Sequence, residues 1–127
     1  MSITEVSKKY GLSPDTLRYY ERIGLIPPVH RTAGGVRDYT EADCNWVNFI
    51  KCMRGAGIQV EALIDYVSLF QQGDATADAR KQILIEQRDQ LQERLQEMQA
   101  TLERLNAKIE HYEEIIVPAE KRKNFYK

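Results

Sequence analysis

The sequence predicts a mainly α-helical chain, with several short helices followed by one long helix. Apolar residues recur at intervals of three and four along most of its length, which is the spacing of helices that bury one face. Capping residues and Gly or Pro breaks divide the first 74 residues into short segments, whereas no Gly or Pro interrupts residues 75–117. We therefore expect an N-terminal domain over residues 1–74, a single long helix over 75–117 and a short tail over 118–127.

Basic residues are concentrated in the first half of the chain. The formal net charge is -1, but residues 1–57 hold eight Lys or Arg against six Asp or Glu, and residues 58–127 hold ten against thirteen. Six of the eight lie between Lys8 and Arg37. A local basic surface on a near-neutral protein is typical of DNA binding.

The sequence contains no signal for a membrane or a secreted location. No stretch approaches the roughly 18 apolar residues that a membrane-spanning helix needs, and the N-terminus has no apolar signal core. The two cysteines are too few for a disulfide scaffold. We expect a cytoplasmic protein without a membrane partner.

Two short helices joined by a tight turn are expected at the N-terminus. Residues 2–5 (SITE) fit a capping box, and Gly11 can end the first helix. Ser13 can cap the second helix, which Gly24 can end. This is a helix-turn-helix pattern, although a helical hairpin of another small domain would have the same spacing.

The second of these helices, within Ser13–Ile26 (SPDTLRYYERIGLI), has two different faces. Its apolar face is formed by Leu17, Tyr20 and Ile23 at helical spacing. Basic, hydroxyl and aromatic side chains stand between them: Thr16, Arg18, Tyr19 and Arg22. Such a face can contact phosphates and base edges, so this helix is the candidate recognition helix and Thr16 and Arg18 are candidate DNA contacts.

A small β-hairpin is expected after Pro27-Pro28. In His30–Tyr39 the pair Gly34-Gly35 stands between two short extended stretches, and Gly-Gly is a signal for a hairpin turn. With Arg31 and Arg37 on its strands, this hairpin would be the wing of a winged helix-turn-helix domain. An ordinary surface loop is the alternative.

Two more helices complete the N-terminal domain. Thr40 can cap a third helix that ends near Gly55 or Gly57, and a fourth helix runs from about Val60 to Gln72.

The long helix carries a coiled-coil pattern. Eight apolar residues alternate spacings of four and three: Leu91, Leu95, Met98, Leu102, Leu105, Ile109, Tyr112 and Ile116. A lone helix cannot bury this stripe and no other segment is long enough to cover it, so we expect a homodimer. A helix folded back on its own N-terminal domain is the alternative. Pro118 is expected to end the helix.

Together these motifs resemble the MerR family of bacterial transcription regulators. The resemblance rests on DTLRYYERIGLI, the Gly-bearing wing that ends in RDYT and the long dimerisation helix, and it covers residues 2–112. It implies a homodimer with an antiparallel coiled coil that binds double-stranded promoter DNA and distorts the promoter spacer for RNA polymerase. It also implies DNA contacts. These are Arg18 and one or both of Tyr19 and Tyr20 in the recognition helix, Arg31, Arg37 and Tyr39 in the wing, and Arg54 near the end of the third helix.

The two cysteines have different expected roles. Cys44 and Cys52 lie about 12 Å apart along one helix, too far for a disulfide. Lys51 and Arg54 next to Cys52 favour the reactive thiolate, although the spacing also suits a passive, half-buried cysteine. The stretch FIKCMRGAGI is similar to a MerR subgroup with a single cysteine that responds to aldehydes and other thiol-reactive stress. This resemblance implies Cys52 as the sensor and Cys44 as a structural residue.

Enzymatic activity is not expected. The sequence shows no nucleophile–base pair, no Gly-rich phosphate loop and no metal-ligand spacing, and His30 and His111 are isolated. We expect no cofactor and no metal. The ten residues from Pro118 onward are too few for a ligand-binding domain. The alternative to a sensor is an effector-independent regulator or an architectural DNA-binding protein in which Cys52 is merely structural.

Overall fold

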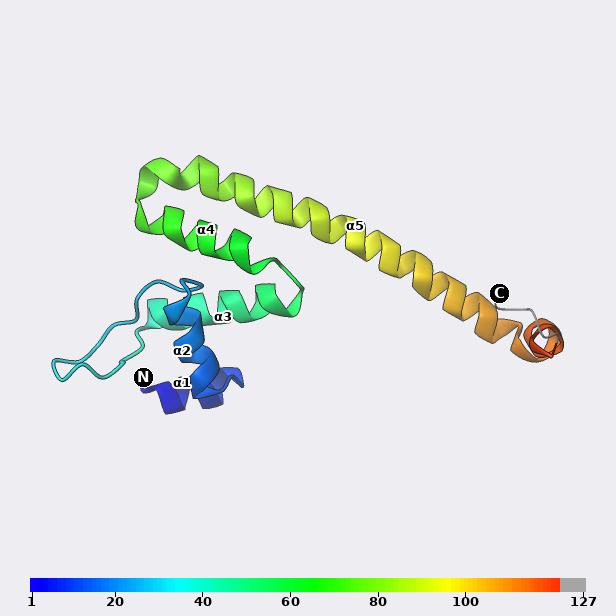
Figure 1. The fold of residues 1–127 in the computed structure, drawn as a ribbon, viewed down its shortest axis with the longest axis horizontal. Helices are drawn as coiled ribbons and strands as arrows, with labels where there is room; N and C mark the ends of the chain where they lie inside the picture. The colour runs from blue at the N-terminus through cyan, green and yellow to red at the C-terminus, as the bar shows by residue number, and fades with distance from the viewer. Residues whose placement is uncertain (122–127) are drawn as a thin grey trace. The chain divides into compact units, whose positions relative to one another are not determined.

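The computed structural model describes residues 1–121, which form two compact units, Met1–Arg88 and the part from Asp89 onward (Figure 1). The described residues are mainly helical, as the sequence predicts, and helix α5 (Ala77–Glu110) contributes to both units.

Helices α1 (Ile3–Tyr10) and α2 (Pro14–Arg22) form the predicted helix-turn-helix. The Ser2 side chain accepts a hydrogen bond from the Glu5 backbone at 3.2 Å, and the Ser13 side chain accepts one from the Thr16 backbone at 3.0 Å. Gly11 has a φ of 66°, the left-handed conformation that ends α1 without steric cost. Local capping chemistry therefore sets the start of both helices and the turn between them.

Helices α3 (Glu41–Gly55) and α4 (Val60–Gln71) lie side by side and are joined by aromatic contacts. The Trp46 ring lies 4.9 Å from the Phe70 ring and 6.0 Å from the Tyr66 ring, in edge-to-face geometry. A short 3-10 turn, η1 (Asp74–Thr76), then leads into α5.

The core of the first unit fixes which face of α2 is left outside. Leu17 on α2 is completely buried against residues of α1, α3 and the loop that follows α2. The largest fully buried side chains are Val6, Leu17, Leu25, Ile26, Val47, Ile50 and Val67. Each contributes about 1.5–3 kcal/mol on burial, so the Leu17 face is held inward and the Arg18–Tyr19 face points outward.

The wing (residues 30–39) is a smaller hairpin than the sequence predicts. Its β-pairing is reduced to one antiparallel bridge between Arg31 and Arg37. The turn itself is regular, since the Thr32 N–H donates to the Val36 carbonyl at 2.8 Å and the Gly35 N–H donates to the Thr32 carbonyl at 2.9 Å. Gly35 has a φ of 83°, which an L side chain rarely adopts. The Gly-Gly prediction of a turn is therefore confirmed, but a ladder of strands is not formed.

The long helix ends earlier than predicted. Regular α-helix stops at Glu110 and is followed by a π-helical segment, η2 (Tyr112–Ile116), and a short helix, α6 (Val117–Glu120). The expectation of one helix to Val117 that Pro118 terminates is therefore wrong. Pro118 is the second residue of α6, where its missing N–H costs no hydrogen bond.

Candidate nucleic-acid interface

The outer face of α2 presents basic and aromatic side chains. Tyr19 is 42% exposed, and its ring lies 5.5 Å from the Arg22 guanidinium in a cation–π contact. Arg18 Nη1 donates to Asp15 Oδ1 at 3.0 Å. The side chain of Asp15 is 95% exposed, so this ion pair is worth at most about 1 kcal/mol and leaves Arg18 free to exchange partners.

Glu21, also on α2, connects the helix with the wing. Its Oε1 accepts from Arg37 Nε at 2.7 Å, and its Oε2 accepts from the Val29 backbone at 3.0 Å and lies 3.8 Å from Arg31 Nη2. The Glu21 side chain is only 13% exposed. The arginines on both sides of the wing are thus held by one carboxylate.

Three predicted DNA-contacting arginines meet at one hollow of about 220 Å³. Arg18 reaches it from α2, and Arg31 and Arg37 reach it from the two sides of the wing. The remaining described residues that line it are Ser2, Ile3, Gly35 and Val36. Arg31 is fixed further by a bond from its Nη1 to the Gly35 carbonyl at 3.0 Å. We refer to this site as the arginine hollow; its described lining has three cations and no carboxylate.

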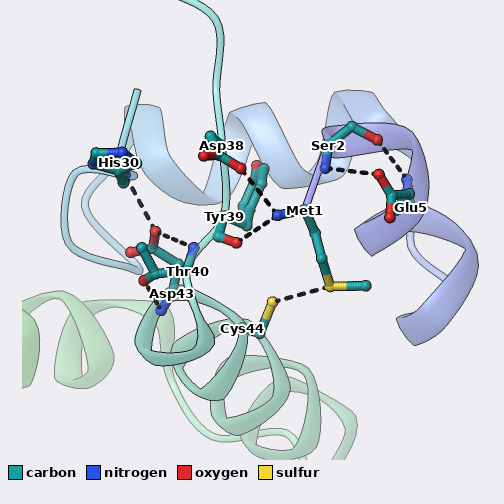
Figure 2. A network of polar contacts seen from close by, with 9 residues as sticks. All are labelled: Met1, Ser2, Glu5, His30, Asp38, Tyr39, Thr40, Asp43 and Cys44. Atoms are coloured by element: carbon teal, nitrogen blue, oxygen red, sulfur yellow. Dashed lines mark hydrogen bonds and ion pairs between the residues drawn. The ribbon is translucent and has the colours of Figure 1, made fainter. Parts of the chain in front are cut away.

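A second set of polar contacts anchors the base of the wing (Figure 2). The Met1 ammonium donates to Asp38 Oδ1 at 3.0 Å and to the Tyr39 carbonyl at 2.8 Å. The hydrogen bond to Asp38 raises the pKa of this amino group. On the other side, the His30 N–H donates to an Asp43 carboxylate oxygen at 3.2 Å. The wing is therefore held at its base by the chain start and by α3, and nearer its arginines by Glu21.

Tyr20 and Tyr39 lie in the core, although both are among the DNA contacts expected from the sequence. They are 7% and 2% exposed, respectively. Burial raises the pKa of both phenols. The reason for Tyr20 is its spacing of three from Leu17, which places both on the apolar face of α2. The Tyr39 hydroxyl is buried and has no hydrogen-bond partner within residues 1–121.

Thr16 and Arg54 use their polar groups in local contacts near helix ends. The Thr16 and Ser13 hydroxyls lie 2.9 Å apart at the start of α2. Arg54 Nη1 donates to the Ile58 carbonyl and closes the turn between α3 and α4. Thr16 is half-buried and Arg54 is exposed, so their predicted DNA contacts stay predictions.

The two cysteines differ sharply in exposure. Cys44 is 4% exposed and its Sγ lies 3.9 Å from the Met1 sulfur, whereas Cys52 is exposed on the same helix. The cations beside Cys52 in the sequence are both engaged elsewhere: Lys51 donates to the Tyr10 carbonyl and Arg54 to that of Ile58.

The predicted dimerisation stripe is exposed along α5 and η2. Leu95, Met98 and Ile109 are 62%, 69% and 70% exposed. Leu91, Leu102, Leu105 and Tyr112 are also exposed, and the side chain of Ile116 lies outside the described residues. Exposed apolar residues in this number and spacing indicate a partner surface.

Sequence reasoning missed Glu21. The signal was present, because Glu21 lies four residues after Leu17 and so on the inward side of α2, where an unpaired carboxylate would be costly. Its partners lie eight to sixteen residues away, across a loop whose path the sequence does not reveal.

Neither a membrane-spanning helix nor a metal site is found among the residues that the structure describes. Within residues 1–121, no helix is long and apolar enough to cross a bilayer, and no three His, Cys, Asp or Glu side chains are grouped to bind a metal ion.

Comparison with known proteins assigns the chain to a family. A family model described as MerR HTH family regulatory protein matches residues 1–69, and one described as MerR, DNA binding matches residues 45–108. The HTH-type transcriptional regulator AdhR of Bacillus subtilis is 57% identical over 91 residues, which span 72% of this chain and 65% of AdhR. The regulator HmrR of Rhizobium leguminosarum is 39% identical over 108 residues, 83% of each chain.

Two solved structures are similar over nearly their whole length. A MerR family transcriptional regulator from Listeria monocytogenes is 48% identical, with a TM-score of 0.88 over 95% of this chain and 92% of that one. HiNmlR, described as a MerR family regulator lacking the sensor domain, was solved bound to promoter DNA. It is 25% identical, with a TM-score of 0.80 over 91% of this chain and 92% of HiNmlR. The present chain belongs to the MerR family of helix-turn-helix, DNA-binding transcriptional regulators.

Proposed function

We propose that this regulator binds promoter DNA as a homodimer, with α2 and the wing of each protomer against the duplex. The arginine hollow is the observation that carries the proposal, because it gathers Arg18, Arg31 and Arg37 from two elements at one exposed place. Guanidinium groups form bidentate, charge-assisted bonds with phosphate oxygens. Tyr19, the residue after Arg18 on α2, adds an exposed aromatic ring that can pack on the DNA backbone.

Dimerisation supplies the second DNA contact surface. The exposed stripe from Leu91 to Tyr112 would pair with the same stripe of a second copy in an antiparallel coiled coil. Two copies related by a twofold axis match a pseudo-palindromic operator. The dimer would distort the promoter spacer between the half-sites and so bring the elements read by RNA polymerase into register. This distortion costs several kcal/mol, which the additional protein–DNA contacts offset. Support comes from HiNmlR, a family member solved on promoter DNA.

Arg18→Ala tests the interface. The variant should weaken operator binding by roughly 1–3 kcal/mol, because a guanidinium in contact with phosphate or base is lost. The dissociation constant can be measured by fluorescence anisotropy on a labelled promoter duplex. Lys81→Ala, which removes one positive charge from an exposed site on α5, is the control and should leave binding unchanged. Equal affinities of Arg18→Ala and the unsubstituted protein would contradict the interface.

The same assay separates a regulator from an architectural DNA-binding protein. A sequence-specific regulator should prefer its operator over a scrambled duplex by about 10³ or more at physiological salt. Near-equal affinity for both duplexes would favour the architectural alternative.

We further propose that Cys52 senses aldehydes or other thiol-reactive stress. Its exposure on α3 supports this, since Cys44 is buried and inaccessible to a reagent in the folded chain. With an aldehyde, the Cys52 sulfur forms a bond to the carbonyl carbon, the carbonyl π bond breaks, and the thiol proton ends on the oxygen to give a hemithioacetal. No oxidant is required.

Cys52→Ser tests the sensor. The variant should bind the operator normally but lose aldehyde-dependent transcription in a reporter assay, because serine is a far weaker nucleophile at neutral pH. Cys44→Ala is the control and should keep the response. A full response of Cys52→Ser would rule out Cys52 as the sensor and leave the effector-independent regulator.

A further inference from the structure

Glu21 is placed where it can determine how the wing meets DNA. It belongs to α2, yet its carboxylate contacts three groups of the segment that follows: the Val29 N–H, Arg37 Nε and the Arg31 guanidinium. We propose that Glu21 is a specificity-determining positioning residue, which fixes the two wing arginines relative to the recognition helix before DNA binds. The proposal rests on the DNA interface proposed above.

The geometry of Arg37 allows it to serve two partners. Arg37 binds Glu21 through Nε, so its terminal amino groups are not part of that bond. Arg37 also lines the arginine hollow. Because a guanidinium has five donors in a rigid plane, one edge can hold the carboxylate while the other donates to a phosphate. The Glu21 contact therefore directs Arg37 instead of competing with DNA for it.

The two arginines are held with different firmness. The Glu21–Arg37 pair is short, at 2.7 Å, and both side chains are mostly buried, at 13% and 24% exposed. The Glu21–Arg31 contact is 3.8 Å and the Arg31 side chain is 43% exposed. Since solvent screens the exposed pair more strongly, Glu21 fixes Arg37 firmly and Arg31 more weakly, and the bond to the Gly35 carbonyl is a second restraint on Arg31.

Fixed cations discriminate between DNA shapes better than mobile ones. A rigid pair of arginines fits only a duplex whose backbone passes at the right distance from α2, whereas mobile arginines reach the phosphates of any duplex. The negative charge of Glu21 also reduces attraction toward DNA in general. Removal of this carboxylate should therefore raise the affinity for non-operator DNA and lower the preference for the operator.

The experiment compares the unsubstituted protein with the Glu21→Gln and Glu21→Ala variants. Each is titrated with two labelled duplexes, the promoter and a scrambled sequence, over a range of salt concentrations. For both variants, we expect the dissociation constant for scrambled DNA divided by that for the promoter to fall about tenfold. On scrambled DNA, the plot of the logarithm of the binding constant against the logarithm of the salt concentration should become steeper, by the amount that about one additional phosphate contact gives. Glu61→Gln removes the same charge from an exposed position on α4 and should leave the ratio unchanged.

Three results would overturn the proposal. The first is an unchanged ratio of the dissociation constants for scrambled and promoter DNA in the Glu21 variants. The second is an equal loss of affinity for both duplexes, which would indicate a purely structural role. The third is a fall of this ratio in Glu61→Gln as large as in the Glu21 variants. Failure of the unsubstituted protein to prefer the promoter would instead contradict the proposed interface, so the two failures are distinguishable.

Arg37→Lys keeps the proposal testable if Glu21 variants do not fold. This variant retains the charge but loses the planar guanidinium that joins Glu21 to a phosphate. A tenfold lower preference for the promoter would support the proposal, and an unchanged preference would refute it.

Discussion

At the scale of single residues, burial separates the groups that can meet DNA from those that support them. Arg18 and Tyr19 are exposed on α2, whereas Leu17 and Tyr20 on the same helix are buried. Tyr39 is an unusual case, because its hydroxyl is buried without a hydrogen-bond partner within residues 1–121. An unsatisfied buried hydroxyl costs about 1–3 kcal/mol.

Tyr39→Phe should therefore leave the protein equally stable or make it more stable by up to about 1–2 kcal/mol, since the ring stays and the unsatisfied hydroxyl is removed. Urea denaturation followed by circular dichroism measures the change. Tyr19→Phe, at an exposed ring, should not alter the free energy of unfolding. A clear loss of stability in Tyr39→Phe would show that the hydroxyl has a partner in solution.

At the scale of elements, the wing depends on one backbone conformation. Gly35 has a φ of 83° in the turn, whereas its neighbour Gly34 does not have a positive φ. The nearest atom to a Cβ at Gly34 would be Thr32 Oγ1 at 3.9 Å, an ordinary contact. The two glycines thus differ in what a side chain would cost.

Gly35→Ala should strain the turn by about 1–2 kcal/mol, because a Cβ disfavours the left-handed conformation. As the wing is a surface element, this strain should loosen the wing without unfolding the protein. We expect faster amide exchange at Thr32 and Val36 and weaker operator binding. Gly34→Ala is the matched control, and equal effects of both variants would contradict this explanation.

Local signals made most of the N-terminal elements predictable. Ser2, Ser13 and Thr40 each cap the helix they were expected to cap, because a cap depends on residues within three positions. The Glu21–Arg37 contact was not predictable, since it depends on the path of the loop between them. The π-helical segment Tyr112–Ile116 was not predictable either, because it contains no Gly or Pro. It lies between Lys108 and Glu120, which form an ion pair at 4.0 Å.

At the scale of the whole molecule, the exposed stripe of α5 is the surface through which the proposed homodimer would form. Apolar residues from Leu91 to Ile109 repeat with the coiled-coil spacing and are exposed in the single chain. Each leucine buried in a dimer contributes about 1.5–3 kcal/mol. The proposed binding at two half-sites would therefore depend on this stripe.

Leu102→Glu should weaken the dimer by at least about 100-fold, because it replaces a leucine of the stripe by a charge in both chains. Sedimentation equilibrium measures the dissociation constant. Ala100→Glu adds the same charge on the opposite side of the helix and should leave the dimer intact. Persistence of the dimer in Leu102→Glu would contradict the predicted stripe.

The contrast in exposure between the two thiols can also be used to measure local unfolding. In the folded chain an alkylating reagent meets Cys52 at once, but it can reach Cys44 only when α3 separates from the start of the chain. The ratio of the two labelling rates, measured by mass spectrometry on one digest, then gives the free energy of that opening. Cys44 is thus a reporter of local unfolding, and Cys52 is its internal reference. Operator DNA should slow the labelling of Cys44 without altering the labelling of Cys52.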